Sequence, residues 1–231
     1  PIAFGVLGLD RFTDTAPVTA AATVVDRPKA APPDSFVLHA PLELMARAAL
    51  LPRVDPAARA DARRRLVWFA ATYAGAGDAA EVDEDRFAGA PAAAVADALV
   101  AAIAAGDLDA AGAAGRALSR TLAPAELVAR LVDVVAPSLA AAAHGGIWLP
   151  QGLSFAGAPA APGAAAMARE LARYPDWRLT WFDEAPVHAV GPVGSAGSVS
   201  SVEDLVAVLR RPPSPGPLDV NFIFPTMHLV E

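Results

Sequence analysis

The chain has 231 residues, of which 55% are hydrophobic and 6% aromatic, and its formal net charge is −7 at pH 7. That length and apolar content allow a buried core and exclude an intrinsically disordered chain. The acidic balance argues against a nucleic-acid or anionic-membrane partner, because such a partner would meet a basic face. The chain has no cysteine, which excludes disulfides, thiolate nucleophiles and cysteine-ligated metal clusters.

Alanine supplies much of the apolar content. It is the best helix former and lets helix backbones approach closely. We therefore predict an all-α fold, a multi-helix bundle of kinked alanine-rich helices with minor β or extended segments near the termini. Three regions are expected: an N-terminal arm or small hairpin over 1–34, a helical domain over 35–211, and a C-terminal extended segment over 212–231. The last segment is apolar, so we expect the natural chain to continue past Glu231.

The first region predicts β structure, with an apolar strand over 2–9 and a short β-type run over 22–25, followed by a proline-rich linker that ends at Asp34. The apolar run at the N-terminus is too short for a signal peptide and lacks a basic leader. The expected location is therefore a bacterial-type cytoplasm, and the Ala, Arg, Asp, Gly and Pro bias indicates a GC-rich genome.

The segment SFVLHAPLELMARAALLP predicts a helix that begins near Pro41 and leaves His39 just outside it. Proline is tolerated in the first turn of a helix but not deep inside one. Glu43 then falls in the first turn, and Arg47 four residues later is placed to form an ion pair with it.

Further helices follow in chain order. Asp55 with Pro56 predicts a helix start, and helical spacing gives this helix a buried stripe of Ala62, Leu66, Phe69, Ala70 and Tyr73. Apolar periodicity then predicts helices over 91–105 (closed by Gly106), over 108–120, and from Pro124 to Gly145-Gly146 with a kink or break at Pro137. Beyond these, the pattern favours short strands over 177–182 and 186–193, a Gly/Ser-rich surface loop over 191–197, and a helix over 201–211.

The stretch from Val134 to Ala168 carries no formal charge and includes His144. A membrane-spanning helix needs roughly 20 strongly apolar residues. Four prolines and a glycine pair interrupt this stretch, so we predict a buried helix, a turn and a second buried segment rather than a membrane span.

Four histidines are candidates for chemistry, and none of them pairs at a metal-ligand spacing such as HxH or HExxH. His144 is predicted at the C-terminal end of a buried helix, where partial negative charge favours the protonated imidazole. His39, placed before a helix N-terminus, has the opposite bias, so the two would form an acid/base pair if they meet. In the alternative interpretation His144 only caps a helix by hydrogen bonding to its last carbonyls.

Three more residues belong to the predicted site. Glu43 could join His39 and His144 as a non-haem metal site of two histidines and a carboxylate, although we predict no resident metal. Trp148 is expected to form a wall of an apolar pocket, and Gln151 to contact the substrate with Glu43.

Two segments resemble the questin oxidase-like family, which opens rings of anthraquinone-type polyketides in secondary metabolism. LHAPLELMARAAL (38–50) is similar to the family's "NHAP" segment and the apolar helix after it, and PSLAAAAHGGIWL (137–149) is similar to its "P-x-x-A-A-A-x-H-G" segment. Leu38 stands where the pattern has asparagine, and Gln151 stands where a second histidine is expected. The resemblance implies that His39 and His144 are site histidines and that the reaction is an NADPH-linked, Baeyer–Villiger-type monooxygenation. No nicotinamide or flavin fingerprint is visible in the sequence.

The sequence thus predicts a small-molecule enzyme, an oxidoreductase or oxygenase acting on an aromatic or polyketide-like substrate in an apolar helical pocket, with His39 and His144 as its catalytic groups. One alternative is a non-catalytic helical binding or scaffold protein. Another is a metal-dependent oxygenase that uses histidine and carboxylate ligands. A homo-oligomer remains open.

Overall fold

The structure, a computed structural model, describes residues 12–155 and 161–179. This part of the chain consists of α-helices and short 3₁₀ turns and contains no β-strand, so the all-α prediction is confirmed. Contacts divide the chain into one unit of 1–178 and another of 179–231, and all the described helices belong to the first. The predicted strands over 2–9 and 186–193, the loop and helix that follow, and the segment 212–231 lie outside the described residues. The predicted domain boundaries stay predictions.

No helix in the described ranges is long and apolar enough to cross a membrane.

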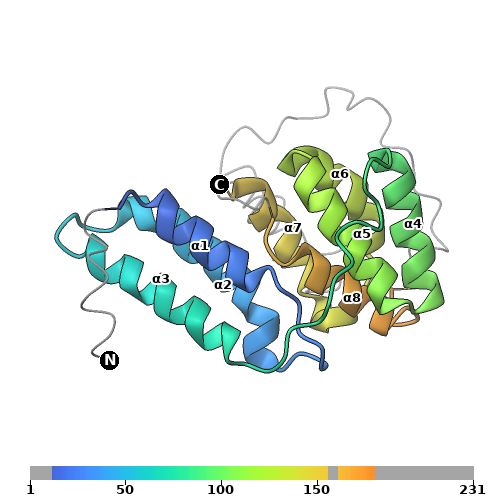
Figure 1. Ribbon diagram of the computed structural model, residues 1–231, viewed down its shortest axis with the longest axis horizontal. Helices are drawn as coiled ribbons and strands as arrows, with labels where there is room; N and C mark the ends of the chain where they lie inside the picture. The colour runs from blue at the N-terminus through green and yellow to red at the C-terminus, as the bar shows by residue number, and fades with distance from the viewer. Residues whose placement is uncertain (1–11, 156–160, 180–231) are drawn as a thin grey trace, which may run out of the picture. The chain divides into compact units, whose positions relative to one another are not determined.

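Helices α1 (Thr15–Val25), α2 (Ser35–Leu50) and α3 (Arg59–Ala74) form a three-helix group (Figure 1). The β-type run predicted over 22–25 is wrong, because these residues form the last turns of α1. Val18, Ala21, Ala22 and Val25 are buried at helical spacing, and packing of this stripe on α2 and α3 outweighs the β preference of the two valines.

Helix α2 begins six residues before Pro41, so the predicted start near Pro41 is wrong. Asp34 is its N-cap, and the Asp34 carboxylate accepts a hydrogen bond of 2.8 Å from the backbone N–H of Val37. Pro41 has no N–H to offer the Val37 carbonyl. A good N-cap and the burial of Ala40 and Leu44, both fully inaccessible, offset that missing bond.

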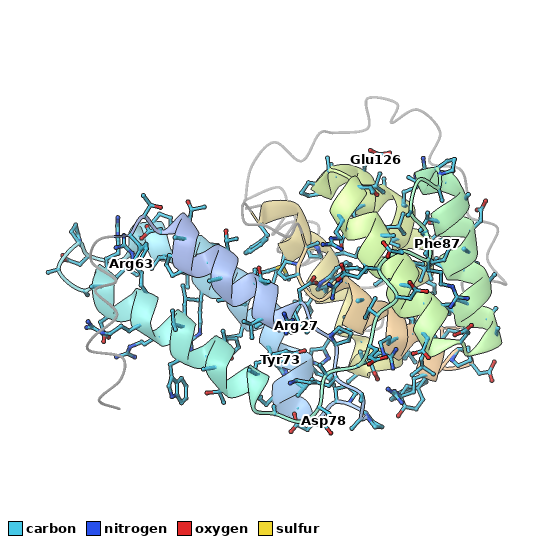
Figure 2. All side chains as sticks on the ribbon, viewed as in Figure 1. Arg27, Arg63, Tyr73, Asp78, Phe87 and Glu126 are labelled. Carbon is cyan, nitrogen blue, oxygen red and sulfur yellow. The ribbon has the colours of Figure 1, made fainter. Side chains whose placement is uncertain are left out.

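Helix α3 also differs from its prediction at the start. Asp55 closes a turn by accepting a hydrogen bond from the N–H of Ala57, and the helix begins only at Arg59. A 3₁₀ turn, Leu51–Arg53, precedes it. The predicted stripe is confirmed, since Leu66, Phe69, Ala70 and Tyr73 are buried and Ala62 packs against them. The Tyr73 hydroxyl donates to the Arg27 carbonyl at 2.7 Å, which ties α3 to the segment after α1 (Figure 2).

A second group of helices (Figure 1) follows as α4 (Ala92–Ala105), α5 (Leu108–Thr121), α6 (Pro124–Val135), α7 (Gly145–Ser154) and α8 (Ala164–Arg173). The predictions for the first two are confirmed, and Gly106 closes α4 in the left-handed conformation at φ 68°. Alanine and glycine let α5 and α8 touch through their backbones. A Cβ added to Gly115 would lie 2.7 Å from the Ala164 carbonyl oxygen.

The helix predicted from Pro124 to the glycine pair is not continuous. It ends at Val135, and a tight turn at Ala140–Ala143, in which Ala141 and Ala142 have left-handed backbone angles, leads into α7. Gly145 therefore begins a helix instead of terminating one. Its role is to allow close packing, because a Cβ there would lie 2.5 Å from Cγ1 of Val135. The predicted division near Pro137 is confirmed. The expected strand over 177–182 is only partly described, and Arg178 forms an isolated β-bridge with Ser138.

The two helix groups meet at Gly163, which precedes α8. The buried carboxylate of Asp26 accepts a hydrogen bond of 3.0 Å from the Gly163 N–H, so a residue from another segment satisfies the N-terminus of α8. Gly163 has φ 88°, and a Cβ there would lie 2.7 Å from two ring atoms of Pro41. This contact places α2 against the start of α8.

Gly163→Ala should destabilise the fold by roughly 2–5 kcal/mol, because it adds left-handed strain to a clash with a rigid proline ring. Gly89→Ala is the matched control: its φ is 74° and nothing lies within 4 Å of an added Cβ. The control should lose only about 1 kcal/mol. Urea denaturation measures both, and equal losses would contradict a specific contact between Gly163 and Pro41.

Burial raises the pKa of Asp26, while the neighbouring Arg116 opposes the shift. The raised pKa means that protonation of Asp26 favours the folded state. This contribution is fully present below the unfolded pKa of about 3.8 and is lost as the pH rises through the folded pKa. Asp26→Asn should abolish the loss of stability that wild type shows as the pH rises through this window. The measurement is the difference in unfolding free energy between wild type and variant at each pH. Asp97→Asn, at an exposed position in α4, should leave the pH dependence of stability close to that of wild type.

Candidate functional site

His39 and His144, separated by 105 positions in sequence, are in direct contact. His39 is the fifth residue of α2 and is exposed, whereas His144 immediately precedes α7 and is half-buried. Their Nε2 atoms lie 3.0 Å apart. The ring centroids are 4.5 Å apart, and the ring planes are nearly perpendicular at 89°. The structure thus brings together the two residues that the sequence predicted as catalytic.

Backbone carbonyls fix the other nitrogen of each ring. Nδ1 of His39 is 2.6 Å from the Ser35 carbonyl oxygen. Nδ1 of His144 is 2.6 Å from the carbonyl oxygen of Ala141 and 3.1 Å from that of Ala142. A carbonyl oxygen only accepts, so both Nδ1 atoms must carry a hydrogen and donate.

These bonds determine what can lie between the two Nε2 atoms. With Nδ1 protonated, each neutral imidazole has only a lone pair at Nε2, and two lone pairs facing each other at 3.0 Å repel. The contact is attractive when one hydrogen lies between the rings. The pair is then an imidazolium that donates to an imidazole and carries one positive charge. A bound cation between the rings would also satisfy both lone pairs.

The helix-dipole argument for opposite biases of the two histidines is wrong. His144 lies at the N-terminal end of α7 and not at the end of a preceding helix, and His39 lies inside the second turn of α2. Both positions are near helix N-termini, so the dipoles do not separate an acid from a base. The two rings are paired by the direct contact between their Nε2 atoms.

Glu43 follows His39 by one helical turn within α2, so the two residues share a face of this helix. Its carboxylate is engaged by Arg47, whose Nε donates at 2.8 Å, and the predicted ion pair is confirmed. The described residues contain no group of three or more His, Asp or Glu side chains placed to hold a metal ion. His188 and His228 lie outside the described ranges.

Trp148 is fully buried, and its indole N–H donates to the Pro162 carbonyl at 3.0 Å. It lines a small cavity of about 30 Å³ together with Pro41, Leu42 and Ala141. Neither His39 nor His144 is among the residues that line this cavity. Gln151 is half-buried, and its Oε1 atom has no hydrogen-bond partner among the described residues.

The residues that orient the two histidines were not predicted from the sequence, because they act through their backbone carbonyls. The carbonyls of Ser35, Ala141 and Ala142 orient the two rings. Asp34 after two prolines is an N-cap signal that could have placed His39 and Ser35 in one helix. No sequence signal marks the three alanines before His144, which adopt left-handed conformations.

Comparison of the chain with protein-family models, with curated proteins and with solved structures finds no match. The resemblance to the questin oxidase-like family stays a prediction.

Proposed function

We propose that the protein is a small-molecule oxidoreductase whose reactive centre is the His39–His144 pair. The observation that carries the proposal is the 3.0 Å contact between the Nε2 atoms while both Nδ1 atoms donate to backbone carbonyls. An imidazolium and an imidazole then share one hydrogen between their Nε2 atoms, and the pair can give this proton to a bound molecule and take it back.

The position of the pair suits an external substrate. His39 is exposed and His144 is half-buried, so a bound molecule can reach the Nε2 atoms from the solvent side. The neighbouring cavity of about 30 Å³ has space for about one water. That cavity is too small for an aromatic substrate, which would reach the histidine pair from its exposed side.

The reaction class comes from the family resemblance at LHAP and AAAAHGG. It makes an aromatic or polyketide-like molecule the substrate and NADPH the reductant of an oxygenation that uses molecular oxygen. The chain's own residues would hold the substrate and move a proton at Nε2 of His39 or His144.

A second candidate function is a metal-dependent oxygenase, favoured by the orientation of the rings. Histidine ligands commonly donate their second N–H to a backbone carbonyl, as both rings do here. Two converging Nε2 atoms would supply two ligands, and Glu43 would supply the carboxylate only after release from Arg47.

His39→Gln and His144→Gln should each lower turnover by about 100-fold or more, because each removes one partner of the proton-transfer pair. NADPH oxidation and oxygen consumption with a panel of hydroxylated anthraquinones provide the readout. Arg65→Gln, the same replacement at an exposed site on α3, is the control and should keep wild-type turnover.

The thermal midpoint should change little in the two histidine variants, since neither ring is fully buried. Turnover that survives both changes would contradict the proposal. A collapse of stability without any detectable turnover of the wild type would favour the scaffold alternative.

Calorimetric titration with Fe(II) and Mn(II) tests the metal candidate. Wild type should bind one ion per chain, and His39→Gln and His144→Gln should weaken binding by 10-fold or more. Arg65→Gln should bind like wild type. Absence of stoichiometric binding to wild type would reject the metal-dependent oxygenase and leave the proton-transfer proposal standing.

A further inference from the structure

The turn before His144 has an unusual backbone. Ala141, Ala142 and Ala143 have φ of 52°, 51° and 61°. Left-handed conformations are unfavourable for residues with a Cβ, and three in succession are rare. Glycine would adopt them without strain, yet the two glycines of this segment come only after His144.

Burial of side chains does not account for the whole turn. Ala140 and Ala141 are buried, but Ala142 is exposed. Its left-handed conformation is therefore not imposed by the packing of its own methyl group. The start of the turn is anchored by other bonds, since the Leu139 N–H donates to the Trp177 carbonyl at 2.8 Å and the Ala140 N–H to the Ser138 hydroxyl at 3.1 Å.

The turn concentrates hydrogen bonds on His144. The Ala141 carbonyl accepts from the backbone N–H of His144 at 3.0 Å and from its Nδ1 at 2.6 Å. The Ala142 carbonyl is a further acceptor for Nδ1 at 3.1 Å. Two carbonyls of this left-handed turn therefore converge on Nδ1 of His144. Nδ1 of His39, inside the regular helix α2, has a single backbone acceptor, the Ser35 carbonyl.

We propose that Ala141–Ala143 is the positioning element of the site: its strained turn holds His144 as the Nδ1–H tautomer with Nε2 directed at His39. This inference rests on the proposed role of the histidine pair. The alanines do not touch the substrate and act only through the orientation of the ring. Strain that persists beside a candidate site is consistent with this role.

Replacement of Ala142 by glycine tests the strain. Ala101, exposed inside α4, is the matched position. Ala101→Gly should lower the thermal midpoint by about 2–4 °C, the usual effect of glycine inside a helix in a chain of this size. Ala142→Gly should leave the midpoint unchanged or raise it, because glycine relieves the left-handed strain. An equal drop in both variants would overturn the inference of strain.

Tautomer-sensitive ¹H–¹⁵N NMR of the imidazole rings tests positioning without any need for turnover. Wild type should show a hydrogen on Nδ1 of both His39 and His144, with one further hydrogen shared between the two Nε2 atoms. Ala142→Val, which disfavours the left-handed conformation further, should abolish the Nδ1–H signature of His144. Ala142→Asn tolerates that conformation and should keep the signature, as should Ala101→Val.

Retention of the Nδ1–H form of His144 in Ala142→Val would overturn the positioning role. If Ala142→Val does not fold, the NMR signature of His144 in Ala142→Asn still tests the positioning role. The change in thermal midpoint of Ala142→Gly still tests the strain. Failure of the proposed function would appear as absent turnover in wild type whose imidazole NMR spectrum still shows the expected hydrogen on Nδ1 of His144. Failure of the positioning role is therefore distinguishable from failure of the proposed function.

Discussion

The contact at Gly163 joins the parts of the molecule on which the site depends. The Asp26 carboxylate satisfies the N–H of Gly163 at the start of α8, and the Pro41 ring of α2 lies against the place where a Cβ would be. A buried carboxylate is costly, and here Arg116 accompanies it at 3.3 Å. Because Pro41 follows His39 by two residues in α2, the packing that fixes Pro41 also fixes the position of His39.

Each histidine is oriented by its own segment and meets the other through tertiary packing. Nδ1 of His39 bonds to a carbonyl four residues earlier, and Nδ1 of His144 bonds to one three residues earlier. These local bonds assign the tautomers independently of the contact between the rings. The 3.0 Å contact between Nε2 atoms then depends on how α2 lies against the segment that leads into α7. A small shift of α2 would therefore separate the pair without changing either tautomer.

The sequence was sufficient where one local rule dominated. The bounds of α4 follow from Pro91 and Gly106, and alanine content predicted the close helix packing. Prediction failed where two rules competed: the N-cap at Asp34 and a buried face outweighed the helix-breaking tendency of Pro41. Gly145 misled for a similar reason, because it serves close packing and not helix termination. The meeting of His39 and His144 depends on packing between segments 105 positions apart, which no local pattern encodes.

The capping interpretation of His144 explains only one of its two ring nitrogens. Hydrogen bonds from Nδ1 to local carbonyls are what a capping histidine makes, and both rings make them. Capping gives no reason for the Nε2 atoms to face each other at 3.0 Å, since two neutral rings in these tautomers would repel there. Two departures from ordinary helix preference lie close to this contact, at Pro41 within α2 and at the left-handed alanines before His144. Such local costs concentrated around one polar contact support the proposal that the pair has a functional role.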